Sequence, residues 1–388
     1  MTPGARAAAA IGVLDRVLAG MPAEQALTNW GRASRYAGSG DRAAVRDLVY
    51  DALRCKRSFA ALGGGMTGRG LVLGALRSTG QEALFDGFGH APGVPGPGDE
   101  GRVPQGAEAL DAPDWLLPAL TASLGADRDA ILRALQARAP VFLRVNPGRG
   151  TVADALAALA AEGIVAAPHP LAATALEVTD NARKIATSQA YLTGLVELQD
   201  VSSQAVVAAL PLRDGMRVLD LCAGGGGKTL AMAAQARIAA FAHDIAPRRM
   251  ADLPARATRA GVAVTMVAVP EDGGPYDLVL VDAPCSGSGS WRRDPEGKWA
   301  LSAERLAALV ALQTQLLARA AALVAPGGGL AYATCSLLDD ENQRQIAAFL
   351  AAQPGWTMQQ HRSFTPLTGG DGFFVAMLTR LPSVTAQP

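Results

Sequence analysis

The second half of the chain alternates short apolar segments with stretches of helical periodicity, and this pattern restricts the fold more than any other feature. The apolar segments are residues 217–221, 238–243, 262–267, 278–281 and 329–333. The helical stretches are residues 229–236, 247–260, 303–324 and 340–352. Such alternation is typical of a parallel sheet with helices on both faces. Two more strand-like runs, 356–360 and 373–379, flank a Gly-Gly-Asp-Gly turn and are expected to pair antiparallel at the sheet edge.

The first part of the chain predicts helices instead. In residues 4–60 apolar side chains recur at helical spacing, and nine lysine and arginine residues accompany five acidic ones, a net charge of +4. The whole chain is neutral, with 35 basic and 35 acidic residues. Arg32 and Arg35 are interleaved with Trp30 and Tyr36. This mixture suits RNA phosphates and stacked bases, and a solvated helix face is the alternative.

The middle of the chain predicts a loop and a second small domain. Residues 87–106 are dense in glycine and proline, which indicates a long ordered loop or a linker. Helical spacing returns at 115–138, and a strand at 142–146 followed by an Ala-rich helix at 152–162 indicates a compact α+β unit. We therefore predict three domains, namely a helical domain with its linker at 1–138, a small α+β subdomain at 139–190 and an α/β catalytic domain at 191–388.

The cysteine pattern and the lack of long apolar segments argue against several classes of protein. The four cysteines are widely separated, with no C-x-x-C pair and no histidine cluster beside them, so neither a zinc site nor a disulfide framework is predicted. No segment approaches the ~20 uninterrupted apolar residues of a membrane span, and the N-terminus does not fit a signal peptide. We expect a cytoplasmic protein without a metal or a membrane partner, and a monomer.

A glycine-rich loop, Cys-Ala-Gly-Gly-Gly-Gly at 222–227, follows the first apolar segment of the predicted sheet and leads into a helix. A phosphate-cradling loop of the G-x-x-x-x-G-K-[ST] type requires glycine where Cys222 stands, and a dinucleotide loop of the G-x-G-x-x-G type requires it where Leu230 stands. A third ligand, an adenosine without phosphates, needs the loop and an acid after the next strand. Asp244 lies there, 24 residues after Asp220, and S-adenosylmethionine fits this pattern.

Two thiols and a carboxylate follow the ends of predicted strands. Asp282 and Cys285 come after the segment ending at residue 281, and Cys335 comes after the segment ending at residue 333. This set suits methylation of cytosine at carbon 5, because a thiolate that adds to carbon 6 makes carbon 5 nucleophilic. An acid near the ring nitrogen and the exocyclic amine stabilises the charge, and a base then removes the proton from carbon 5. Lys228 can reach this site from the glycine-rich loop.

Several longer motifs agree with this chemistry and resemble one family. They are Leu-Arg-Val-Asn at 143–146, Leu-Gln-Asp-Val-Ser-Ser-Gln at 198–204, the loop at 222–229, Asp-Ala-Pro-Cys-Ser-Gly-Ser-Gly at 282–289, Arg-Arg at 292–293, Thr-Cys-Ser at 334–336, Glu-Asn at 341–342 and Gly-Asp-Gly-Phe-Phe at 370–374. Together with the basic helical start, they resemble the RNA cytosine-5 methyltransferases, most closely the RsmB type. The resemblance implies a Rossmann-like, S-adenosylmethionine-dependent catalytic domain, a NusB-like helical RNA-binding domain in front of it, and small-subunit ribosomal RNA as substrate.

The resemblance also implies roles for individual residues. Cys335 is expected to be the nucleophile, and Cys285 is expected to assist breakdown of the covalent adduct. Asp282 and Lys228 would hold and polarise the target base. The cofactor-binding set implied by the family comprises Cys222, Ala223, Gly224, Gly225, Gly226, Gly227, Lys228, Asp244, Arg249 and Asp282. The residues expected to contact RNA are Arg32, Arg35, Arg292 and Arg293.

Two places depart from the family pattern. Gly224 and Gly225 replace Ala-Pro in the glycine-rich loop, which is expected to loosen the loop and weaken cofactor binding. The acid that the family often places after the third strand is absent from 267–269, where Glu271 or Asp272 could substitute. An RNA-binding ribosome-assembly protein without turnover is the alternative function. A small-molecule methyltransferase is a third, and the basic helical start argues against it.

Overall fold

The computed structural model describes residues 1–381, which belong to two compact units. The first, here called the helical unit, contains Met1–Arg138 and a second segment, Trp291–Leu301. The other, here called the α/β unit, contains Ala139–Ser290 and the described residues from Ser302 onward. The small α+β region is therefore grouped with the large sheet, and one piece of the chain after residue 290 is grouped with the helices.

The helical unit is built from helices, several of which share one core of apolar side chains. Its helices are α1 (Pro3–Leu18), α2 (Ala23–Ala33), α3 (Ser39–Arg54), α4 (Lys56–Leu62), α5 (Gly68–Ser78), α6 (Gly106–Ala109), α7 (Leu117–Leu124), α8 (Arg128–Gln136) and α14 (Pro295–Ala300). Leu14, Val49 and Leu73 are fully buried and join α1, α3 and α5 in that core. The helical stretch expected over 115–138 is divided into α7 and α8, because Gly125 adopts a φ of +54° between them.

Residues Trp291–Leu301, here called the clasp segment, complete the helical unit. Lys298 Nζ donates to the carbonyl of Arg54 at 2.8 Å, and Trp299 Nε1 donates to the preceding carbonyl at 2.7 Å, at the carboxyl end of α3. Arg54 Nε in turn donates to the carbonyl of Arg292 at 2.7 Å. The last carbonyls of a helix have no partner within the helix, so the clasp segment satisfies groups that α3 leaves open. The sequence pattern places this segment in the third domain, and nothing local in it indicates its packing.

The α/β unit is built on a seven-stranded sheet with the order β10-β11-β9-β8-β5-β6-β7. The strands are β5 (Arg217–Asp220), β6 (Ala239–Ala242), β7 (Val264–Met266), β8 (Tyr276–Asp282), β9 (Val324–Thr334), β10 (Trp356–Phe364) and β11 (Phe373–Arg380). Strands β5 to β9 are parallel, and β11 pairs antiparallel with both β9 and β10 at one edge. The predicted Rossmann-like fold is confirmed. Its strand order reverses at β5, between β6 and β8, which is where such folds bind ligands.

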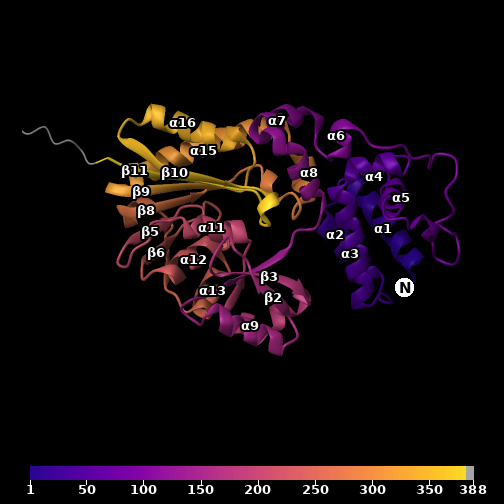
Figure 1. Ribbon diagram of the computed structural model, residues 1–388, viewed down its shortest axis with the longest axis horizontal. Helices are drawn as coiled ribbons and strands as arrows, with labels where there is room; N and C mark the ends of the chain where they lie inside the picture. The colour runs from indigo at the N-terminus through magenta and orange to yellow at the C-terminus, as the bar shows by residue number, and fades with distance from the viewer. Residues whose placement is uncertain (382–388) are drawn as a thin grey trace, which may run out of the picture. The chain divides into compact units, whose positions relative to one another are not determined.

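Helices cover both faces of this sheet (Figure 1). They are α11 (Val201–Ala208), α12 (Gly227–Gln235), α13 (Leu253–Ala260), α15 (Ala303–Leu323) and α16 (Gln343–Ala352). On one face Leu317 of α15 and Phe349 of α16 share a core with Val279. On the other face Val206 of α11 shares a core with Leu280 of β8 and with residues of α12. By length and composition α15 could cross a membrane, yet Leu317 and its neighbours bury one side of the helix in the core of this unit.

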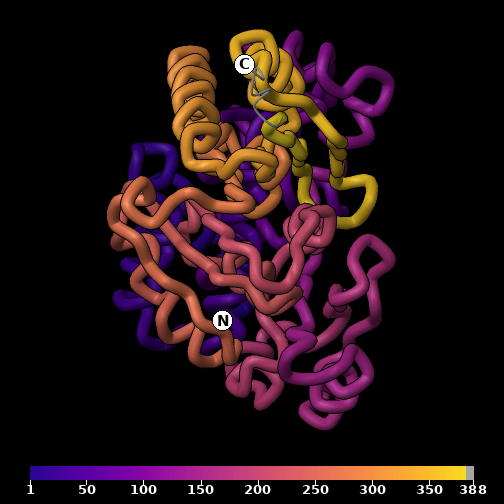
Figure 2. The backbone as a smooth tube through the Cα atoms, turned by 90° about the vertical axis from the view of Figure 1, so that its left-hand side faces the viewer, coloured from indigo at the N-terminus to yellow at the C-terminus, as the bar shows by residue number. Residues whose placement is uncertain are grey.

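A second, four-stranded antiparallel sheet belongs to the same unit, with the order β2-β3-β1-β4. Its region contains β1 (Val141–Val145), α9 (Val152–Ala161), β2 (Val165–Pro168), β3 (Ala175–Asp180), α10 (Gln189–Leu192) and β4 (Val196–Leu198). Figures 1 and 2 show α9 and β2 at the opposite end of the unit from β10 and β11. Buried Arg144 donates to the carbonyl of Gly227 at 2.9 Å, and Asn146 donates to that of Ala260 at 2.8 Å. The small sheet is thus bonded to α12 and α13, which follow the glycine-rich loop.

Candidate active site

Two of the side chains expected to carry the chemistry, and one further carboxylate, lie at the carboxyl ends of three adjacent strands. Asp220 ends β5, Asp282 ends β8 and Cys335 follows β9, and these strands are neighbours in the parallel sheet. The loop after β8 bonds to the end of β9, where Gly289 N donates to the carbonyl of Cys335 at 2.9 Å. Because the carboxyl ends of parallel strands meet at one edge, residues far apart in the sequence share one site.

The two thiols of this site are in contact. Cys285 Sγ lies 3.4 Å from Cys335 Sγ, and both cysteines are free. The hydrogen bond from Cys285 lowers the pKa of Cys335. Lys228 and Ser290 act in the same direction, against burial and the charge of Asp282. The bond between the sulfurs, together with burial, raises the pKa of Cys285 well above its usual value. Cys335 is therefore the thiol of the pair that ionises more readily, and Cys285 is the S–H donor.

A buried carboxylate, which the sequence offers only as part of a family motif, links the two cysteine loops. Glu341 is fully buried and accepts hydrogen bonds from Ser286 N at 2.8 Å and from Gln313 Nε2 at 3.0 Å. The hydroxyls of Ser286 and Ser336 both donate to its other oxygen. Each of these serines directly follows one of the two cysteines. Glu341 therefore fixes the backbone beside both thiols, and its role depends on a partner 55 residues away.

Lys228 and Asp282 form an ion pair at the same sheet edge. Lys228 Nζ donates to Asp282 Oδ2 at 2.7 Å and lies 4.8 Å from the centre of the Phe373 ring. Burial acts to lower the pKa of Lys228, but the charge and hydrogen bond of Asp282 outweigh it, so that this pKa is raised. The lysine therefore stays an ammonium. The side chain of Asp282 is 32% exposed and remains accessible to a ligand.

The glycine-rich loop is held by hydrogen bonds from outside it. Gly224 N donates to Asp244 Oδ2 at 2.9 Å, and the guanidinium of Arg256 donates to the carbonyl of Gly225. Gly226 has a φ of +79°, and a Cβ there would lie 2.3 Å from a side-chain carbon of α13, so only glycine fits. The loosening expected from Gly224 and Gly225 is thus opposed by bonds to neighbouring helices and strands. Weaker cofactor binding stays a prediction.

A cavity of about 220 Å³ adjoins this loop. The residues that line it include Cys222, Asp244, Ile245, Arg249, Leu316 and Arg319. Asp244 is buried and pairs with Arg249 at 3.1 Å. Burial raises the pKa of Cys222 to about 12, which makes it a neutral lining group. An acid beside apolar Ile245 and Leu316 suits a ribose and an adenine ring, so the residues present fit the predicted S-adenosylmethionine.

The acid expected after the third strand has a candidate substitute in this chain, but that residue is engaged in an ion pair. Glu271, a candidate substitute, pairs with Arg319 at 2.8 Å, and this hydrogen bond lowers the pKa of Glu271 to about 2. Arg319 itself lines the cavity, together with His243. The Nδ1 atom of His243 lies 3.0 Å from the carbonyl of Val267, and its buried Nε2 has no hydrogen-bond partner within residues 1–381. His243 is therefore a lining residue of the cavity that has one buried ring nitrogen without a partner.

The arginines expected to contact RNA differ in exposure. Arg32 and Arg35 are exposed, and neither has a carboxylate partner among the described residues. Arg293 is exposed as well, and its phosphate contact stays a prediction. Arg292, in contrast, is only 4% exposed, although two consecutive arginines usually indicate a surface. A side chain so deeply buried is poorly placed to bind a phosphate, so the expectation for Arg292 finds no support in the structure.

Known families and relatives match this chain over most of its length. The sequence pattern of the 16S rRNA methyltransferase RsmB/F family matches residues 207–383, and that of the ferredoxin-like domain of RsmF/B-like methyltransferases matches residues 112–184. Ribosomal RNA small subunit methyltransferase B from Xanthomonas campestris pv. campestris is 36% identical, over 71% of this chain and 68% of that protein. The protein of the same name from Klebsiella pneumoniae subsp. pneumoniae is 35% identical, over 69% of this chain and 66% of its own length. The similarity therefore spans about two thirds of these relatives.

Solved structures agree on the fold. The crystal structure of PH0851 superposes with a TM-score of 0.76 at 23% identity, over 97% of this chain and 99% of that one. A methyltransferase homolog protein from Pyrococcus horikoshii gives a TM-score of 0.63 at 24% identity, over 71% of this chain and 97% of that one. At such identities the two structures support the fold alone. The family patterns and the relatives above 30% identity, together with the site geometry, lead to the conclusion that this chain belongs to the RsmB/F family of ribosomal RNA methyltransferases, with S-adenosylmethionine as cofactor.

Proposed function

We propose that this protein methylates carbon 5 of a cytosine in small-subunit ribosomal RNA through a covalent adduct with Cys335. The contact between Cys285 and Cys335 at 3.4 Å is the observation that carries the proposal. A protein that only binds RNA has no need of two free thiols whose pKa values are shifted in opposite directions. The names of the relatives support small-subunit ribosomal RNA as the substrate.

Cys335 is the nucleophile in this mechanism. Its thiolate adds to carbon 6 of the cytosine, and the electron pair of the C5–C6 double bond moves to give an enamine with a nucleophilic carbon 5. When bound, S-adenosylmethionine supplies an electrophilic methyl group, which carbon 5 takes. A water molecule acting as base then takes the proton from carbon 5, the electron pair of that C–H bond re-forms the C5–C6 double bond, and the C6–S bond breaks to release the Cys335 thiolate. The lowered pKa of Cys335 suits both its attack and its departure.

Cys285 acts at the end of the reaction. Its raised pKa keeps it protonated, and its sulfur lies against that of Cys335. A hydrogen bond from Cys285 to the departing thiolate stabilises the negative charge that develops on the sulfur as the adduct breaks down. Without this donor, the methylated base should remain attached to Cys335 for longer.

Asp282 and Lys228 bind the target base. The Asp282 carboxylate can accept from the exocyclic amine of cytosine, and the Lys228 ammonium can donate to its carbonyl oxygen. Charge spreads over this edge of the ring when the thiolate adds, so a fixed ion pair there lowers the barrier. The glycine-rich loop, Asp244 and Arg249 would hold the cofactor. Free cysteines suit the reducing cytoplasm, where we also propose that the protein acts, as a monomer.

The alternative is an RNA-binding ribosome-assembly protein without turnover, and the Gly224–Gly225 departure from the family loop is the feature that favours it. Incubation with radiolabelled S-adenosylmethionine and unmodified small-subunit ribosomal RNA separates the two functions. Wild type should yield labelled 5-methylcytidine and Cys335→Ala none, while Cys285→Ala should form a protein–RNA complex that survives denaturant. Cys55→Ala, which removes a half-buried thiol of the helical unit, is the matched control and should behave as wild type.

Exchanged behaviour of the two active-site variants would overturn the assignment of roles to Cys285 and Cys335. RNA binding by wild type without any transfer of label would favour the assembly protein. In that case Gly224→Ala and Gly225→Pro, which restore the family's loop sequence, would be the first changes to test for recovery of activity.

A further inference from the structure

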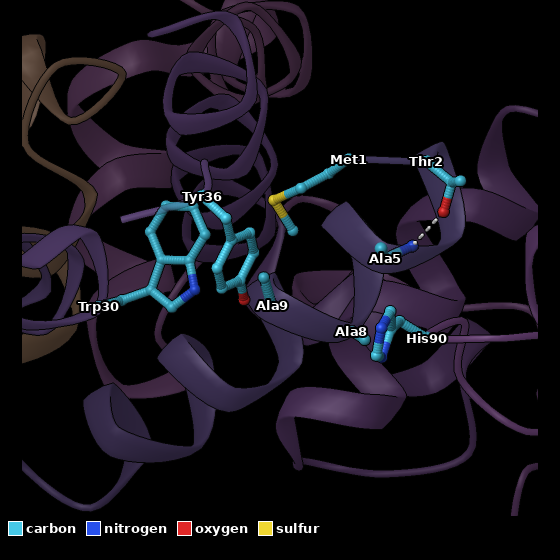
Figure 3. Close-up of a pocket in the computed structure, with 8 residues that line it drawn as sticks. All are labelled: Met1, Thr2, Ala5, Ala8, Ala9, Trp30, Tyr36 and His90. Carbon is cyan, nitrogen blue, oxygen red and sulfur yellow. Dashed lines mark hydrogen bonds between the residues drawn. The ribbon is translucent and has the colours of Figure 1, made fainter. Parts of the chain in front are cut away.

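A cavity of about 660 Å³ lies in the helical unit, and the proposed chemistry does not use it. Figure 3 shows Trp30 and Tyr36 on one side of it, His90 on the other, and the small side chains of Ala8 and Ala9 of α1 between them. Its size lies within the range of about 300–1,000 Å³ that is usual for small-ligand sites. Met1 also lines the cavity beside the Tyr36 ring (Figure 3), so a flat ring would have aromatic and apolar neighbours.

Tyr36 is the unusual residue of this cavity. Its side chain is 74% exposed, although a tyrosine ring normally buries most of its apolar surface. The turn that carries it is held in place, because Ser34 N donates to the carbonyl of Trp30 at 2.9 Å and Ala37 N donates to that of Ser34 at 3.0 Å. Arg42 Nε adds a bond to the carbonyl of Ala37 at 3.1 Å. A ring displayed on such a fixed turn is preorganised for a planar partner.

Arginines without a carboxylate partner lie next to this turn in the chain. Arg32 and Arg35 are exposed, and within residues 1–381 neither they nor Arg42 form an ion pair with a carboxylate. Other arginines of the helical unit do pair with carboxylates, among them Arg46, Arg57 and Arg69. Guanidinium groups next to an exposed aromatic ring are the combination that binds the phosphates and bases of single-stranded nucleic acid.

The opposite wall belongs to the glycine- and proline-rich loop, which carries His90. Arg69 Nη2 donates to the carbonyls of Gly93 at 2.9 Å and Val94 at 3.2 Å, and so ties the loop to α5. On its other side the loop touches α1, where a Cβ on Gly4 would lie 2.6 Å from the Cβ of Ala91. Of the two possibilities left open by the sequence, this stretch is therefore an ordered loop. Hydrogen bonds and close packing thus hold both the turn with Tyr36 and the loop with His90 in place.

We propose that this cavity binds an unpaired nucleobase of the ribosomal RNA substrate, stacked on the ring of Tyr36, while Arg32 and Arg35 bind the flanking phosphates. The proposal rests on the RNA substrate of the proposed function and adds a second RNA contact, in the helical unit. Stacking on an aromatic ring tolerates any base, because every base has a π face. The cavity thus selects single-stranded RNA rather than a particular sequence.

Fluorescence anisotropy with the full chain and fluorescein-labelled decauridine tests this site without cofactor or catalysis. Tyr36→Ala should weaken binding about 5- to 100-fold, which is the effect of losing one stacked base. Tyr36→Phe keeps the ring and should bind within about twofold of wild type. Phe88→Ala is the matched control, because Phe88 is 86% exposed in the same unit but does not line the cavity. An abasic probe of ten ribose phosphates should bind wild type and Tyr36→Ala equally.

The phosphate contacts have a separate signature. Arg32→Ala and Arg35→Ala should each reduce the slope of log Kd against log salt concentration by about 0.7 to 1. Equal affinity of Tyr36→Ala, Phe88→Ala and wild type for decauridine would overturn the proposal and leave the cavity to a protein partner. That result would not touch the proposed methylation. Conversely, binding that depends on Tyr36 in a protein that methylates no cytidine would refute the proposed function alone.

Discussion

Lys228 Nζ lies 2.7 Å from Asp282 Oδ2, although 54 residues separate the two in the chain. The first turn of α12, directly after the glycine-rich loop, carries the lysine, and the end of β8 carries the aspartate. One side chain is a fixed donor and the other an acceptor. A cytosine carries an acceptor and a donor of its own, so the pair can bind both at once.

Replacing the acid of this pair should therefore impair catalysis more than folding. We expect Asp282→Asn to lower kcat/KM for methylation on the order of 100-fold, because the amide keeps the shape but not the charge. Asp277→Asn places the same substitution at the other end of β8 and should retain most of the activity. Steady-state rates of both variants, with circular dichroism as a check of folding, test this. Similar losses in the two variants would contradict a role in base binding.

The thiol pair predicts an unusual pH dependence for alkylation. Because the pKa of Cys335 is lowered, its thiolate should persist at a pH where an ordinary cysteine is protonated, and its reactivity should fall only as the pH drops through that lowered value. Cys285→Ala removes the S–H donor, so the midpoint for Cys335 should move to higher pH. Mass spectrometry of iodoacetamide-treated protein over a pH series measures both. An unchanged midpoint in Cys285→Ala would mean that the thiol is not the donor.

Glu341 predicts a loss of both stability and activity. Glu341→Gln replaces an acceptor oxygen by a donor, which leaves at least one of its buried partners, Ser286, Ser336 or Gln313, unsatisfied. We expect a loss of about 2 kcal/mol in the free energy of unfolding, seen as a drop in Tm of roughly 4–8 °C, together with a lower kcat. Glu304→Gln, at the exposed start of α15, is the control. Unchanged Tm and kcat would show that Glu341 does not hold the loops.

Lys298 of the clasp segment predicts a pH-dependent stability. Burial lowers its pKa to about 8, against about 10.4 in an unfolded chain. Between these values the unfolded chain still holds a proton that the folded protein has lost, so the free energy of unfolding should rise with pH across this window by about 3 kcal/mol. Below pH ~8 Lys298 is protonated in both the folded and the unfolded state, so it no longer makes the free energy of unfolding depend on pH.

Lys298→Met should abolish that rise. Differences in Tm between wild type and Lys298→Met, measured from pH 7 to 10.5, isolate the contribution of this side chain. Lys184→Met removes an exposed lysine and should run parallel to wild type. A flat difference for Lys298→Met would contradict the buried, readily deprotonated lysine.

The sheet and the thiols could be predicted because their signals are local. Strands buried on both faces require apolar runs, so the segment around Val279 is visible in the sequence. Cys285 and Cys335 follow two such runs, and adjacent parallel strands end at one edge. The ends of elements were less certain, since β9 begins at Val324 and includes the three glycines 327–329, and α16 begins only at Gln343.

The features that escaped prediction depend on partners distant in the chain. Glu341 gains its role from Ser286, 55 residues before it, and Lys298 bonds to a carbonyl 244 residues away. His243 lines the cavity only because of the way that the loops after three strands come together. Arg292 is only 4% exposed although the neighbouring Arg293 is exposed, and the sequence does not distinguish the two. Local patterns carry no information about such long-range contacts.

The clasp segment also affects the order in which the protein can fold during translation. When the ribosome has made residue 138, the carboxyl end of α3 still lacks the donors of Lys298 and Trp299. These are synthesised about 160 residues later, which at cellular rates takes roughly 10 to 30 s. The helical unit begins to emerge first, but it cannot complete its folding until the clasp segment has been synthesised. Nascent chains arrested before residue 291 should expose α3 to protease, and chains released after residue 301 should protect it.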